Sequence, residues 1–65
     1  MKNILLHPNN GEPIYVALTD DGVFHVIYQT ISMSSHTTLR AAVNNASSEF
    51  IASGAMGIMG WSLIE

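Results

Sequence analysis

One short motif, Asp21-Gly22, most constrains how this chain can fold, because it separates two runs of β-branched and aromatic residues at 14–19 and 23–31. An Asp-Gly pair in this setting favours a tight hairpin turn with positive φ angles. We therefore expect the two runs to pair as antiparallel strands. A shorter apolar run at 4–6, followed by the Pro-, Asn- and Gly-containing segment 8–11, predicts an earlier strand and a loop.

The apolar spacing changes from that of a strand to that of a helix after Ser34-Ser35. We predict a helix over 36–53, with a hydroxyl cap from this serine pair and with Gly54 at its C-terminus. The residues of its buried stripe are Leu39, Ala42, Val43, Ala46 and Phe50. Residues 56–64 then predict a last strand, which its two glycines weaken.

These elements predict a single α+β domain over residues 1–65, in the order βββαβ. The expected sheet has four strands, is mostly antiparallel and carries one helix on one face. A right-handed crossover through the helix would return the last strand parallel to the third and beside the first, in the order 3-2-1-4. The other face and the two edges of the sheet are then open to a partner.

Size and composition suggest that this fold needs support from association. A chain of 65 residues buries a small core, and with no cysteine it has no disulfide to supplement it. Charged residues make up only 11% of the chain, so charge repulsion between copies is weak. We predict a homo-oligomer, most simply a dimer, and the lack of cysteine is consistent with a reducing cytoplasm.

Several partner classes are disfavoured by the charge and hydropathy pattern. Lys2 and Arg40 are the only lysine and arginine, which is too little positive charge for phosphate binding, so we expect no nucleic-acid partner. The apolar run at 4–6 is too short for a signal peptide. The uncharged stretch 50–64 is too short and too rich in glycine for a membrane span, so we expect no membrane insertion.

No residue pattern indicates catalysis. His7, His25 and His36 fall on different predicted elements, without the convergent spacing of a metal site. Asp20 and Asp21 are explained by the hairpin turn. The serines lack a Gly-x-Ser-x-Gly motif, and no glycine-rich phosphate loop is present. We predict no enzymatic activity, no metal and no cofactor.

Large aromatic and methionine side chains are the best candidates for contact with a partner protein, since such residues anchor many interfaces. The predicted partner-binding residues are Tyr15, Phe24, Tyr28, Met59 and Trp61. For Phe24, Met56, Met59 and Trp61 the alternative role, core packing, is expected for at least half of the set. His25 and Arg40 are possible ligand contacts.

The segment Thr38-Leu39-Arg40-Ala41-Ala42 at the start of the helix, together with the order βββαβ, resembles HicB-like antitoxin domains. This resemblance implies a dimer that binds and neutralises a toxin. Without it, the residues indicate a small non-enzymatic protein-binding module, an inhibitor that occludes a macromolecular partner, as small phage and mobile-element proteins often do. A third hypothesis is an oligomer that binds a small molecule or nucleotide in an interface pocket.

Overall fold

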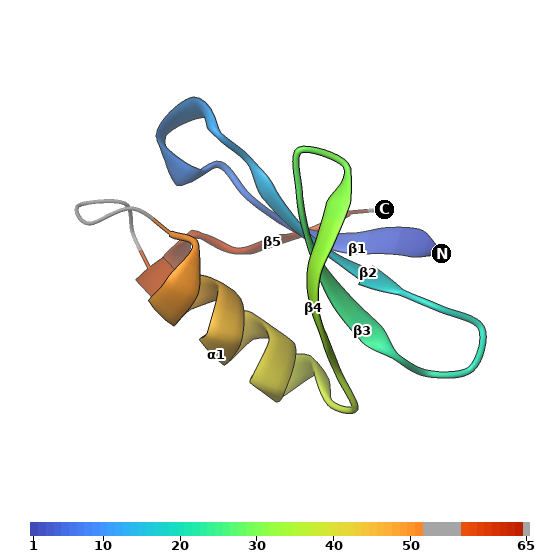
Figure 1. Ribbon diagram of the computed structural model, residues 1–65. Coiled ribbons are helices and arrows are strands. Elements are labelled where there is room, and N and C mark those ends of the chain that lie inside the picture. Colours follow the sequence, from blue (N-terminus) through green and yellow to red (C-terminus); the bar gives the residue numbers. More distant parts are fainter. Residues whose placement is uncertain (52–56, 65) are drawn as a thin grey trace.

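The computed structural model describes residues 1–51 and 57–64 and has an α+β fold in which helix α1 crosses one face of an antiparallel sheet (Figure 1). In chain order the elements are β1 (Lys2–His7), the 3-10 turn η1 (Asn9–Gly11), β2 (Ile14–Leu18), β3 (Phe24–Tyr28), β4 (Ile31–His36), α1 (Leu39–Glu49), the 3-10 turn η2 (Gly57–Gly60) and β5 (Ser62–Leu63). The predicted fold class is confirmed.

Over the described residues the sheet has five strands in the order β4-β3-β2-β1-β5, one more than the sequence predicted. The additional strand is β4, which pairs antiparallel with β3. The last strand lies beside the first, as expected, but it is antiparallel to β1 and therefore also to β3. The predicted direction is wrong because β4 reverses the chain once more before the helix begins.

The predicted hairpin between β2 and β3 is confirmed, with Leu18 opposite Phe24. Its loop is longer than the predicted tight turn. The Thr19 N–H donates to the Val23 carbonyl, and the three residues between them form the loop. Among these three, only Gly22 has a positive φ, at +84°. This is a three-residue hairpin loop in which glycine takes the left-handed position.

Helix α1 begins at Leu39, later than predicted, because β4 uses the residues that were expected to start it. Thr38 rather than the serine pair is the N-cap, and its Oγ1 accepts a hydrogen bond from the Ala41 N–H at 3.1 Å. The helix ends at Glu49 with Phe50 as C-cap. The predicted cap Gly54 lies outside the described residues.

The predicted apolar stripe of α1 packs on the sheet. Ala42 and Ala46 are fully buried against Val16 and Val26, and Val43 and Phe50 pack around them. Leu39 remains 37% exposed at the start of the helix. Because side chains alternate along a strand, His25 and Ile27 lie on the face opposite α1.

The last strand is much shorter than the predicted 56–64, since among the described residues 57–64 it is Ser62 and Leu63 that pair with β1. Residues 57–60 form η2 instead, and Met56 lies outside the described residues. Gly60 lies directly against the ring of His7. The chain therefore approaches the core closely before it can join the sheet.

Candidate functional site

The candidate site is a groove at the end of the sheet where β3 turns into β4. Two hollows of about 260 and 280 Å³ share Tyr15 and Thr30 in their walls. The first is also lined by Gly11, Glu12, Pro13, Tyr28 and Gln29, and the second by Met1, Asn3 and Ile27. We call the two hollows together the Tyr15 groove.

Thr30, one of the two residues that line both hollows, belongs to a strained turn. Gln29 and Thr30 connect β3 to β4 with φ angles of +53° and +66°. Two consecutive positive φ angles define a type I′ hairpin turn, which strongly prefers Asn-Gly. A left-handed backbone is uncommon for glutamine and a clear outlier for β-branched threonine. Such strain concentrates at functional sites, where the surrounding structure holds it in place.

We expect Gln29→Asn/Thr30→Gly to raise the free energy of unfolding by about 1 kcal/mol, because it removes the left-handed penalty at Thr30. The greater flexibility of glycine in the unfolded chain offsets part of the gain. Denaturant unfolding would measure the change. The matched control is Thr37→Gly, an exposed position without a positive φ, which is expected to destabilise. A loss of stability in the turn variant would show that Thr30 is not strained.

Tyr28 and Glu12 form the polar end of the groove. Partial burial and the negative charge of the neighbouring Glu12 raise the pKa of Tyr28 above its usual value. The Gln29 amide donates to the same phenol oxygen at 3.4 Å. The Tyr28 hydroxyl is therefore neutral at pH 7, and the groove offers a carboxylate at this end.

The structure brings two of the five predicted partner-binding residues, Tyr15 and Tyr28, into the groove. Core packing, the alternative role, applies to Phe24, Tyr28 and Trp61, which all pack against the hydrophobic core. The Trp61 ring meets His7 edge-on, with ring centres 5.4 Å apart, and its Nε1 donates to the Ser47 hydroxyl at 3.3 Å. Met59 is 78% exposed on η2 and does not line the groove.

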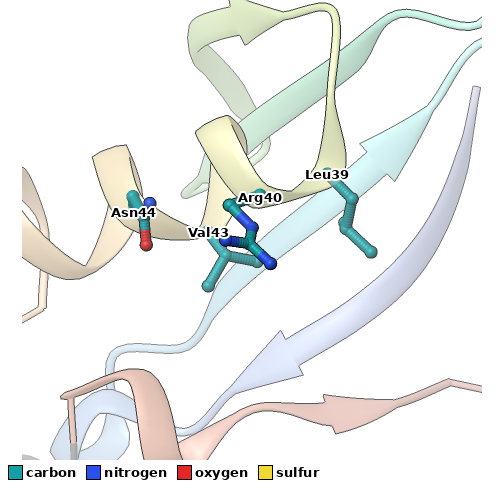
Figure 2. Close-up of a pocket in the computed structure, with 4 residues that line it drawn as sticks. All are labelled: Leu39, Arg40, Val43 and Asn44. Atoms are coloured by element: carbon teal, nitrogen blue, oxygen red, sulfur yellow. The ribbon is translucent and has the colours of Figure 1, made fainter.

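The two possible ligand contacts lie apart from the groove and from each other. His25 Nδ1 is 2.9 Å from the Ser32 hydroxyl on the face opposite α1. Arg40 lines a third hollow, of about 390 Å³, with Leu39, Val43 and Asn44 (Figure 2). These four residues all belong to α1, and no residue of the Tyr15 groove is among them.

The three histidines also lie in different environments. His7 is buried, and its Nδ1 accepts the Asn9 N–H at 3.0 Å. His36 Nε2 is 3.0 Å from the Ser34 hydroxyl. Within the part of the chain that the structure describes, no three histidine, aspartate or glutamate side chains gather as metal ligands would.

Sequence reasoning missed Gln29, Thr30 and Glu12 as residues of the site. It treated 23–31 as one strand because the turn contains neither glycine nor asparagine. A signal was nevertheless present, since the alternation Ile31-Ser32-Met33-Ser34 is typical of a strand that begins after a polar pair. The insertion of β4 also changes the element order on which the resemblance to HicB-like domains rested.

Neither a protein-family model, nor a curated protein, nor a solved structure matches the chain. Over residues 1–51 and 57–64, no helix combines the length and apolar character needed to cross a bilayer.

Proposed function

We propose that the chain is a small non-enzymatic protein-binding module, an inhibitor that occludes its partner by holding a partner segment in the Tyr15 groove. The observation that carries this proposal is the strained turn at Gln29-Thr30, since Gln29 lines the first hollow and Thr30 lines both. Selection for stability alone favours Asn-Gly at such a turn. A strained residue beside the half-buried aromatic side chains of Tyr15 and Tyr28 is expected where binding is the selected property.

The chemistry of the groove defines the segment it would hold. The second hollow has apolar walls from Met1, Ile27 and Tyr15, which suit an aliphatic or aromatic anchor. The first hollow ends at the Glu12 carboxylate, and neither hollow has a lysine or arginine among its described wall residues. The chain carries a net charge of −3 at pH 7. The proposed ligand is therefore a peptide segment with an apolar anchor next to a lysine or arginine.

Inhibition by occlusion requires a well-placed surface and no reacting group, which suits a chain of this size. We place the activity in the cytoplasm, where a protein without disulfides suffers no disadvantage. A HicB-like antitoxin would be one case of the same mechanism, with a toxin as the occluded partner. A small-molecule ligand is the alternative that the experiment below must separate.

The test is selection of a random peptide display library against the purified chain. We expect enriched peptides to carry an apolar residue beside a basic one. Tyr15→Ala should weaken the best peptide about 30-fold, which is typical for loss of an aromatic anchor. Glu12→Gln should weaken it less, through loss of the charge pair. Met59→Ala is the matched control, because Met59 is exposed outside the groove, and it should bind like the parent chain.

Two results would overturn the proposal. Peptides that bind equally to the parent chain and to a folded Tyr15→Ala variant would place binding elsewhere. A failure to enrich any peptide, together with a thermal shift by nucleotides, would indicate a small-molecule binder instead. Circular dichroism of each variant would show that the fold is intact.

A further inference from the structure

Strand β4 forms an exposed and unprotected edge of the sheet. It lies at the end of the strand order, and within residues 1–51 and 57–64 it pairs on one side only, with β3. Its six residues, 31–36, include no proline, lysine, aspartate or glutamate, which are the residues that usually prevent edge-to-edge pairing. Ile31 is 60% exposed and Met33 is 45% exposed. Such an edge is a template for one more strand.

The register with β3 shows which backbone groups of β4 point outward. In an antiparallel ladder, bonded pairs alternate with pairs whose N–H and C=O groups point away from each other. The two-residue turn closes on the pair Tyr28–Ile31, so Ser32, opposite Ile27, points its groups outward. Beyond the bulge, Ser34 opposite Val26 is bonded, and Ser35 points outward.

The bulge determines what can pair with this edge. In a regular strand, the residues whose N–H and C=O groups point outward are two positions apart. The bulge makes this spacing three positions, from Ser32 to Ser35. A regular strand therefore matches one of these positions but not both. An antiparallel strand with the same bulge can bond to both Ser32 and Ser35. In that pairing Ser32 of each copy lies opposite Ser35 of the other copy.

We propose that β4 is the self-association edge of this protein and that its occupant is the β4 strand of a second copy, related by a two-fold axis. The two five-stranded sheets become continuous across this pairing. No carboxylate of β4 opposes the contact, because the strand consists of Ile31, Met33, His36 and three serines. This surface is distinct from the Tyr15 groove, so the inference does not depend on the proposed function.

Light scattering and analytical ultracentrifugation of the full chain test the association. We expect a concentration-dependent species of twice the 7.0 kDa chain mass. Ser35→Pro removes one outward N–H without removing a bond to β3, and it should weaken the dimer about tenfold. Ser35→Ala, which keeps the N–H, should associate like the parent chain. A monomer at every concentration would overturn the proposal.

Disulfide cross-linking tests the register even if the proline variant fails to fold. The chain has no cysteine, so introduced thiols are unique. Ser32→Cys mixed with Ser35→Cys should cross-link as a heterodimer, more efficiently than either variant alone. Ser48→Cys, on the exposed part of α1, is the control for random collision. Equal yields from the mixture and from Ser48→Cys would refute pairing through β4.

Discussion

Replacing Asn9 with aspartate is expected to lower the free energy of unfolding by about 3 kcal/mol. Asn9 is only 4% exposed, and its amide nitrogen donates to two backbone carbonyls, those of Glu12 at 3.1 Å and Phe50 at 3.2 Å. These bonds tie the loop after β1 to the end of α1. Aspartate would place a carboxylate oxygen against both carbonyls in a site that excludes most water.

The matched control for this prediction is Asn10→Asp. Asn10 also has a positive φ, +55° against +45° at Asn9, but its side chain is exposed. The same chemical change there should alter the free energy of unfolding by less than about 0.5 kcal/mol. Urea unfolding of both variants would measure the difference. Equal losses would show that the loop backbone, rather than the buried amide, is responsible.

Gly60→Ala is expected to lower the free energy of unfolding by about 2 kcal/mol and the melting temperature by about 10 °C. A Cβ atom at this position would lie 2.3 Å from His7 Nε2 and 2.8 Å from the next ring carbon. The ring cannot move away easily, because it is 99% buried, contacts Trp61 and accepts the Asn9 N–H. The cost is steric, since Gly60 does not have a positive φ.

A double-mutant cycle with His7→Ala tests this explanation. In the His7→Ala background the ring is absent, so Gly60→Ala should cost much less than in the parent chain. Nδ1 of His7 is an acceptor, so the neutral ring carries its proton on Nε2, which has no hydrogen-bond partner among the described residues. The two changes would be additive if Gly60 acted through the backbone alone.

The sequence identified the parts of this fold that depend on local spacing. The hairpin around Gly22 and the helix stripe of Ala42, Val43, Ala46 and Phe50 are in place because turn chemistry and apolar periodicity act within a few residues, whereas Leu39 of the predicted stripe stays exposed. The turn at Gln29-Thr30 was missed for the opposite reason. Gln29 and Thr30 both disfavour the left-handed backbone that they adopt, so the sequence carries no local preference that predicts this turn.

The candidate site was only partly predictable. Tyr15 and Tyr28 were chosen as large aromatic side chains, and both line the groove, although Tyr28 also packs against the core. The same criterion chose Phe24 and Trp61, which pack against the core. Residue type alone cannot separate these roles, because large aromatic side chains are favoured both in cores and at interfaces.

By itself the sequence determined the class of the fold, the hairpin at Asp21-Gly22 and the face of the helix that meets the sheet, since each follows from local backbone preference and apolar spacing. Only the tertiary structure decided the rest. It set the strand count, the direction of β5, the close approach of Gly60 to His7 and the groove around Tyr15. These features depend on long-range packing, which can hold a strained turn against the preference of its own residues.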